Sequence, residues 1–245
     1  MQPTGIPIDL DQLTDQPLFA DIDAVSIAAI ASGGWAVAEG RGARILSRGD
    51  HLEGLYSVFQ GSLKLYMLSC SGDERVLRVL QPGDSFGEAI MFNEIPSPVF
   101  VETLSPVTLG YFPREVIRAA LVSNPSFTES MLKSMSALMR QLIQDLETCC
   151  MQNALQRTAS YLLRQAEAAG PPHLQVALPA PKAVVASTLN ISAETFSREL
   201  HRLQDAGLIE IERRTIYLRD RDALVAACEG GGIAASGRRH AGGSG

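Results

Sequence analysis

The fold is decided by two neighbouring segments, KAVVASTL at Lys182–Leu189 and SAETFSRELHRLQD at Ser192–Asp205, which are separated by two residues. In the second segment Phe196, Leu200 and Leu203 recur at steps of three and four, which places them on one face of a helix. The first segment is shorter and has an apolar pattern of the same kind. The two patterns predict helices over residues 182–189 and 193–205, joined by a tight turn.

The residues around the longer helix fix its ends and predict a hairpin after it. Ser192 is a favoured N-cap, and Gly207 is a favoured stop because glycine accepts a left-handed backbone. Two short apolar runs follow, at 208–211 and 215–218, on either side of the basic pair Arg213-Arg214. Helix, turn, helix and two-stranded wing form a winged helix-turn-helix, whose second helix enters the major groove of DNA.

The side of this second helix opposite Phe196 is polar and carries groups that read base pairs. The guanidinium of Arg198 matches guanine O6 and N7, the carboxylate of Glu194 accepts from cytosine N4, and Ser197 suits a base or a phosphate. A surface ion pair between Glu194 and Arg198 is the competing interpretation. The predicted DNA contacts are Ser192, Glu194, Thr195, Ser197, Arg198, His201, Arg213 and Arg214.

Charge is divided unevenly along the 245 residues, which have a formal net charge of −6. Residues 1–150 hold 10 Lys and Arg against 18 Asp and Glu, a balance of −8. Residues 151–245 hold 11 against 9, a balance of +2. The overall acidity therefore does not exclude a C-terminal DNA-binding domain, and the acidic part is expected to sense a signal.

Residues 44–113 read as short strands separated by turns. Leu63, Leu65 and Met67 alternate with Lys64 and Tyr66, which is the period of a half-buried strand. Gly-Asp steps recur at 49–50, 72–73 and 83–84 and favour tight turns. Many short strands separated by turns predict an antiparallel β-barrel or sandwich.

A long helix is predicted over residues 127–151, where apolar residues recur at steps of three and four. A helix between two domains has little of its own chain to cover it, so we expect a two-stranded dimer; burial against the barrel is the alternative. A second helix is expected from 153 to 169. The predicted dimer interface consists of Met131, Met135, Leu138, Leu142 and Cys149, with Leu132, Met139, Ile143 and Leu146 beside them.

These features together resemble the Crp/Fnr family of transcription regulators over residues 18–229. The resemblance implies an α+β fold with an N-terminal cyclic-nucleotide-binding-type β-barrel (jelly roll), a long dimerisation helix and a C-terminal winged helix-turn-helix. It also implies a homodimer on a double-stranded DNA palindrome and, for an activator, RNA polymerase as a partner. The motifs that carry it are Ser192–Arg198, Leu200, Leu203, Gly207, Leu208-Ile209, Gly49-Asp50, Gly61, Pro82-Gly83-Asp84 and Phe86-Gly87-Glu88.

Departures from the family pattern bear on the DNA site and on the signal. The cyclic-AMP-responsive relatives have an arginine before the glutamate of the reading helix, and here Ala193 stands there, which implies Fnr-like TTGAT half-sites. Pro98 and Val99 stand where those relatives hold the cyclic phosphate, so cyclic AMP is not expected. A cyclic-nucleotide-responsive regulator stays the alternative. No cysteine precedes Cys70, so an iron-sulfur cluster of the Fnr type is not expected.

The segment Gly87–Phe92 resembles the Dnr/Nnr branch, whose members respond to nitric oxide and control denitrification. That resemblance implies haem as a cofactor in an apolar pocket, with an ordinary packed core as the alternative. His51 is the candidate axial ligand, and a solvated turn histidine is the competing interpretation. The predicted effector pocket consists of Phe86, Glu88, Met91, Phe92, Val99, Leu142 and Ile143.

Other classes of protein fit the sequence less well. A cupin-type metal enzyme needs several barrel histidines, and residues 44–113 hold only His51. No apolar run approaches ~20 residues and no secretory signal is evident, so we expect no membrane partner and a cytoplasmic protein. The expected domains are an N-terminal arm (1–17), a barrel (18–126), the dimerisation helix (127–151), a DNA-binding domain (152–229) and a disordered tail (230–245).

Overall fold

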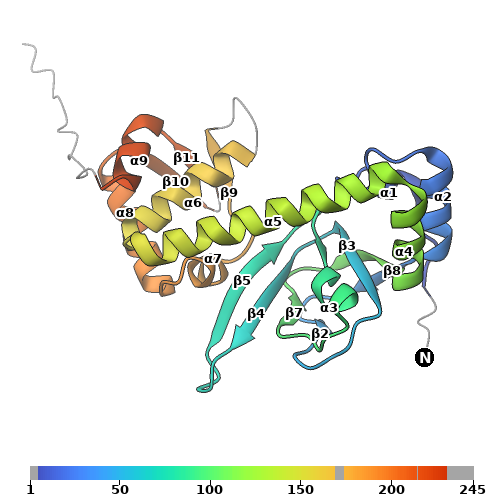
Figure 1. Ribbon diagram of the computed structural model, residues 1–245. Helices are drawn as coiled ribbons and strands as arrows, with labels where there is room; N and C mark the ends of the chain where they lie inside the picture. Colours follow the sequence, from blue (N-terminus) through green and yellow to red (C-terminus); the bar gives the residue numbers. More distant parts are fainter. Residues whose placement is uncertain (1–4, 169–173, 214, 231–245) are drawn as a thin grey trace, which may run out of the picture. The chain divides into compact units, whose positions relative to one another are not determined.

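The computed structural model describes residues 5–168, 174–213 and 215–230. The chain divides into two compact units, Met1–Ile143 and Gln144–Gly245, each with its own buried residues. The fold is the predicted one: an N-terminal sandwich of β-sheets, a long helix and a C-terminal helix-turn-helix with a wing (Figure 1). Among the described helices none is long and apolar enough to cross a membrane.

Unit 1 is built on two antiparallel four-stranded sheets, in the orders β1-β8-β3-β6 and β2-β7-β4-β5. The strands are β1 (Trp35–Glu39), β2 (Arg44–Leu46), β3 (Gly54–Gln60), β4 (Leu63–Leu68), β5 (Glu74–Leu80), β6 (Ser85–Phe86), β7 (Phe100–Thr103) and β8 (Val107–Pro113). The helices are α1 (Leu10–Thr14), α2 (Ala24–Gly33), α3 (Glu88–Asn93), α4 (Arg114–Ser123) and the first part of α5 (Pro125–Met151).

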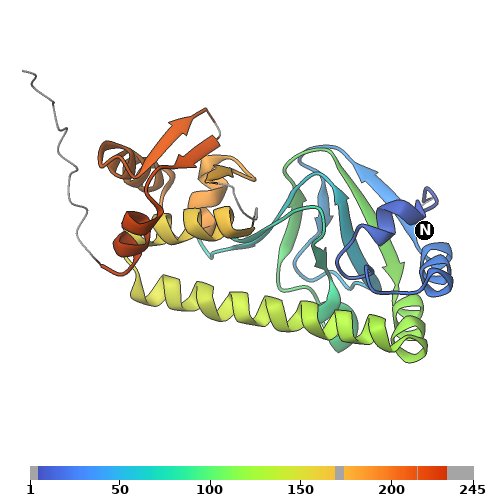
Figure 2. The same ribbon diagram turned by 90° about the horizontal axis from the view of Figure 1, so that it is seen from above.

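Unit 1 has two cores. The first lies between the two sheets. The second lies under the helices, and Figure 2 shows α2 and α4 at one end of the strands. In the second core the ring of Phe19 stacks on that of Phe127 at 5.6 Å between centroids and meets Phe112 at 5.3 Å. Ile8 and Leu13 are buried in the same cluster. The described part of the predicted arm, residues 5–17, is therefore not separate from the domain, because Ile8 and Leu13 complete this core.

Strand β4 keeps the alternation that the sequence predicted. Its register with β7 is unbroken, and Leu63 and Leu65 face the core between the sheets. Tyr66 lies on the other face and is buried there, because the ring of Phe100 stacks on it and Lys64 lies over it. Met67 is 39% exposed and lies beyond the last residue that pairs with β7.

Helix α5 begins at Pro125, two residues before the predicted start. Proline suits the first turn because its missing N–H would be unpaired there, and the Asn124 side chain accepts from the Phe127 N–H at 3.0 Å. The helix runs unbroken into unit 2, so it is shared between the units rather than forming a domain of its own.

Unit 2 contains the end of α5, α6 (Ala154–Ala168), β9 (Gln175–Ala177), α7 (Lys182–Thr188), α8 (Ala193–Asp205), β10 (Ile209–Glu212), β11 (Thr215–Leu218) and α9 (Arg221–Cys228). Helix α6 packs against α8 and α9. Strand β9 joins the predicted hairpin in the order β10-β11-β9. Helix α8 has the predicted bounds and α7 ends one residue early, whereas β9 and α9 were not predicted. The tail after 230 lies outside the described residues.

Candidate nucleic-acid interface

Helix α8 is fixed at both ends and along its inner face. The hydroxyl of Ser192 accepts from the Thr195 N–H and donates to the Thr195 hydroxyl, both at 3.0 Å, which closes the first turn. Gly207 follows the helix with φ +75°, a conformation that only glycine adopts without strain. Phe196, Leu200 and Leu203 are fully buried. The helix is therefore a rigid support for the side chains on its outer face.

The outer face of α8 presents the predicted reading residues. Glu194 and His201 are exposed, Ser197 is half-buried, and the side chain of Arg198 is 63% exposed. Ser192 and Thr195 are joined to each other in the cap, so their hydroxyls serve the helix before any contact with DNA. Glu194, Ser197 and Arg198 remain the predicted base-reading set.

Arg198 pairs with a residue that sequence reasoning missed. Its Nε donates to Oε1 of Glu199 at 3.2 Å, whereas the competing interpretation paired it with Glu194. Arg202 donates from Nη1 to the other oxygen of Glu199 at 2.7 Å. The Glu199 side chain is only 4% exposed. One signal was present in the sequence: residue 199 is three after Phe196 and one before Leu200, at the edge of the apolar stripe.

The wing ends in a cation. In the hairpin the last pair is Glu212 with Thr215, and Arg213 follows directly after the last paired residue of β10. Arg213 is exposed and has φ +55°, in the left-handed region. Arg213 thus stays a predicted phosphate contact, and Arg214 lies outside the described residues.

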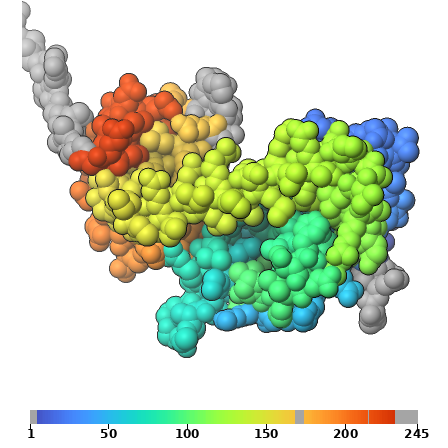
Figure 3. All heavy atoms as spheres, in the orientation of Figure 1, coloured from blue at the N-terminus to red at the C-terminus, as the bar shows by residue number. Residues whose placement is uncertain are grey.

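Helix α5 carries an apolar stripe that the described chain leaves open. In the space-filling view of Figure 3 the surface of α5 is uncovered along much of its length. Alternating steps of three and four connect five of its exposed apolar residues, which is the period of a coiled-coil seam. The exposed fractions are Leu132 61%, Met135 43%, Met139 66%, Leu142 58% and Leu146 65%.

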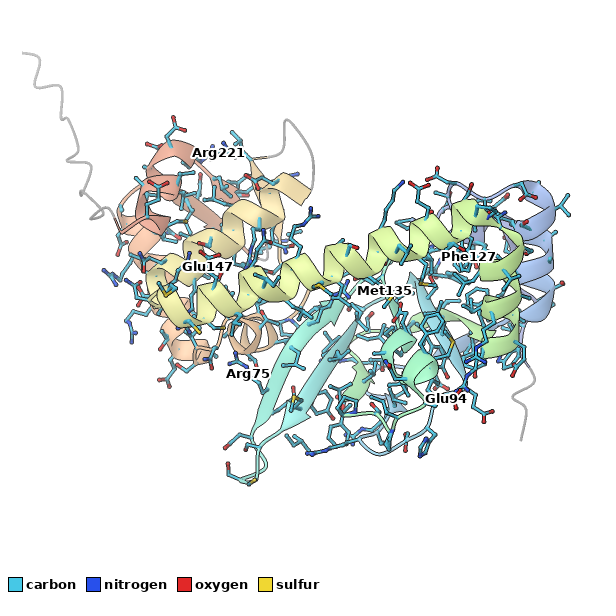
Figure 4. All side chains as sticks on the ribbon, viewed as in Figure 1. Arg75, Glu94, Phe127, Met135, Glu147 and Arg221 are labelled. Carbon is cyan, nitrogen blue, oxygen red and sulfur yellow. The ribbon has the colours of Figure 1, made fainter. Side chains whose placement is uncertain are left out.

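The exposed stripe coincides only in part with the predicted dimer interface. Met131, expected there, is 3% exposed because it belongs to the core formed by Phe19, Phe112 and Phe127. Phe127 and Met135, both labelled in Figure 4, mark where α5 changes from a buried to an exposed helix. Leu138 is 36% exposed and lies beside the stripe, and Cys149 is half-buried. Ile143 also lies beside the stripe and is 62% exposed. The open face is therefore rotated toward the residues that were predicted as flanking.

The predicted effector-pocket residues are divided between the two cores of unit 1 and the exposed face of α5. Phe86 belongs to the core between the sheets, whereas Met91 is fully buried in the core under the helices. Phe92 packs against the second core and Val99 is half-buried. Leu142 and Ile143 are on the open face of α5. The apolar residues that suggested a cavity are largely used in packing.

The polar residues of this region lie around the turn before α3. Ser85 donates to the carboxylate of Glu88, and Arg78 forms an ion pair with Asp84. Burial raises the pKa of Glu88, and the hydrogen bond from Ser85 opposes that rise. In the described loop 94–99 the charged residue is Glu94, which pairs with Arg114 from α4. The loop therefore offers no cation of its own for a cyclic phosphate.

Haem does not fit the described residues of unit 1. His51 is exposed in the loop between β2 and β3. Met91 is the one residue of the predicted pocket whose side chain has a sulfur atom that could bind haem iron. It is fully buried among apolar side chains. His201 is on α8, and His173 and His240 lie outside the described residues. Among the described residues no cluster of three histidine, cysteine or carboxylate side chains is placed to hold a metal ion.

Two family models match the chain in tandem. The model "Cyclic nucleotide-binding domain" matches residues 40–124, and "Crp-like helix-turn-helix domain" matches residues 156–227. The "CRP-like cAMP-activated global transcriptional regulator" of Mycobacterium tuberculosis is 23% identical over 211 residues, which are 85% of this chain and 94% of that protein. The "Fumarate and nitrate reduction regulatory protein" of Escherichia coli is 26% identical over 189 residues, 76% of this chain and 75% of that protein.

Solved structures share the fold. A CooA mutant from Carboxydothermus hydrogenoformans has a TM-score of 0.72 at 21% identity, over 87% of this chain and 96% of that chain. FixK2 from Bradyrhizobium japonicum has a TM-score of 0.69 at 20% identity, over 79% and 96%. The relatives are named as regulators and not as enzymes, which removes the cupin-type alternative. The chain belongs to the Crp/Fnr family of DNA-binding transcription regulators, with an N-terminal effector-binding domain.

Proposed function

We propose that the protein acts as a homodimer and binds a DNA palindrome with TTGAT-type half-sites through α8. The observation that carries this proposal is the outer face of α8, where Glu194, Ser197 and the 63%-exposed Arg198 stand on a buried, capped helix. A two-fold dimer presents two such helices, and half-sites one DNA turn apart, ~34 Å, match that symmetry. The open stripe of α5 supports the dimer.

Selection from a random duplex library with the purified full chain tests this proposal. We expect the recovered sequences to contain two inverted TTGAT half-sites with centres about one helical turn apart. A recovered single half-site, or a pool with no consensus, would contradict the palindrome. The variant Arg213→Ala is the matched control, because loss of a phosphate contact weakens binding without changing the consensus.

For the signal, we propose nitric oxide, which would control denitrification genes, from the resemblance of Gly87–Phe92 to the Dnr/Nnr branch. Haem was expected as its carrier, and no step through haem is proposed because the described residues do not fit it. Fluorescence titration of the palindrome with and without a nitric oxide donor, each with and without added haem, is the test. Affinity that changes with the donor supports the proposal, and affinity indifferent to it under both conditions contradicts it.

Cyclic AMP is expected not to bind. A cyclic phosphate taken out of water needs a cationic or amide partner, and the described loop from Glu94 to Val99 supplies no cation. Calorimetry with millimolar cyclic AMP should show no saturable heat. The double variant Pro98→Arg with Val99→Ser restores an arginine and a hydroxyl at this place and should gain affinity. Saturable micromolar binding by the unmodified protein would favour the cyclic-nucleotide alternative.

A further inference from the structure

The reading helix contains a buried carboxylate that holds two of its arginines. Glu199 has a side chain only 4% exposed, and its two oxygens accept from different guanidinium groups, those of Arg198 and Arg202. The distances are 3.2 Å from Arg198 Nε and 2.7 Å from Arg202 Nη1. Both arginine side chains nevertheless remain more than half exposed, at 63% and 56%. Each guanidinium therefore donates to Glu199 and still has exposed surface.

The choice of donor atom on Arg198 matters for base reading. A guanidinium offers two edges that form paired hydrogen bonds, one with Nε and Nη and one with both Nη atoms. Glu199 occupies Nε. The edge left for guanine O6 and N7 is therefore the terminal one, with the two Nη atoms. A flexible arginine on a bare helix would sample both edges and many rotamers, at a cost in ordering entropy on binding.

The negative charge of Glu199 also affects DNA of any sequence. A carboxylate beneath the interface offsets part of the attraction between phosphates and the two arginines, which lowers non-specific affinity. The fixed geometry of Arg198 favours the base pairs of the specific site. The reduced net positive charge of the helix weakens binding to DNA of any other sequence. Both effects raise the ratio of specific to non-specific binding.

We propose that Glu199 is a positioning residue that fixes Arg198 with its terminal edge toward the base pairs and holds Arg202 beside it. This proposal rests on the proposed function, since it assigns Arg198 to base reading. A cavity of about 210 Å³ lies beside the carboxylate, lined by Asn153, Ala154, Leu155, Glu199 and Arg202. Residue 199 therefore borders this pocket on one side.

Three variants separate the geometry of Glu199 from its charge. Glu199→Gln removes the charge, and Glu199→Asp keeps the charge but shortens the reach by one methylene. Glu167→Gln is the matched control: it removes the same charge from unit 2 at a carboxylate that pairs with Arg221, labelled in Figure 4, and that is not on the reading helix. Each is titrated against fluorescent TTGAT palindrome and scrambled duplex, after circular dichroism has established an intact fold.

We expect the palindrome-to-scrambled affinity ratio to fall about tenfold in Glu199→Gln and in Glu199→Asp, the order of one charge-assisted hydrogen bond. Compared with the wild type, Glu199→Gln should bind scrambled DNA more tightly, and Glu199→Asp should bind it with the same affinity. The ratio should be unaltered in Glu167→Gln. An unaltered ratio in both Glu199 variants, with the wild type still preferring the palindrome, would overturn this proposal alone; a wild type without preference would overturn the proposed function as well.

A measurement without DNA keeps the proposal testable if Glu199→Gln does not fold. In the free protein the Nε–H of Arg198 should give a nuclear magnetic resonance signal that exchanges slowly with water, because it donates to a buried carboxylate. The signal should exchange faster in Glu199→Asp and be absent in Arg198→Ala. A rapidly exchanging signal in the wild type would contradict the assigned geometry.

Discussion

Met139→Glu is expected to convert the dimer into monomers and to abolish binding to the palindrome. Met139 is 66% exposed in the single chain and lies in the middle of the α5 stripe, so a glutamate there leaves the fold of one chain intact. In a two-stranded seam the same change places two carboxylates opposite each other in an apolar contact. An unpaired charge in such a site costs several kcal/mol, ~3–5 in measured cases.

Light scattering at micromolar concentration measures this directly. Ala137→Glu is the matched control, because residue 137 is exposed on the same helix and is two positions before Met139, on the side away from the stripe. Ala137→Glu should remain a dimer. Leu138→Glu, beside the stripe, should have an intermediate effect. A wild type that is monomeric, or a Met139→Glu variant that stays dimeric, would show that α5 does not form the interface.

Arg198→Ala is expected to weaken palindrome binding by ~1–3 kcal/mol per half-site and to relax the preference at one base pair. The dependence of affinity on salt should change little, because the lost contact is to a base and not to a phosphate. Arg213→Ala at the wing should do the opposite: it should weaken all sequences alike and reduce the salt dependence. Titrations of palindrome and scrambled duplex at two salt concentrations distinguish the two outcomes.

The alternative for Arg198 is that it only attracts DNA. In that case Arg198→Ala would lose equal affinity on the palindrome and on the scrambled duplex, and would also lower the salt dependence. The reading helix would then have been assigned wrongly, and the ion pair of Arg198 with Glu199 would be a structural contact within α8.

Local signals made the C-terminal half predictable. The bounds of α8 follow from Ser192 and Gly207, which act on the backbone next to them and need no distant partner. The short strand β9 was missed because it exists through pairing with β11, some forty residues further along the chain. A strand of three residues is too short for its sequence pattern to indicate such a pairing.

The residues that were placed wrongly are those whose surroundings come from distant parts of the chain. Met131 continues the apolar period of α5, and its burial depends on Phe19 and Phe112, which no spacing along the helix reveals. From the sequence, Ile8 and Leu13 were assigned to a separate N-terminal arm. In the structure both are buried in the same core as Met131. In the effector domain Phe86 and Met91 are close in sequence and packed in different cores. Periodicity identified the apolar residues and could not say which of them share a neighbour.

The central claim, that a symmetric dimer reads two half-sites through α8, is tested most directly with three duplexes that differ only in their half-sites. One carries two inverted TTGAT half-sites, one has a single half-site scrambled, and one has both scrambled. At one fixed salt concentration the wild-type dimer should bind the duplex with two half-sites at least ~10³-fold more tightly than the duplex with none. The affinity for the duplex with one half-site should lie between these two. Equal affinity for all three duplexes would contradict the claim.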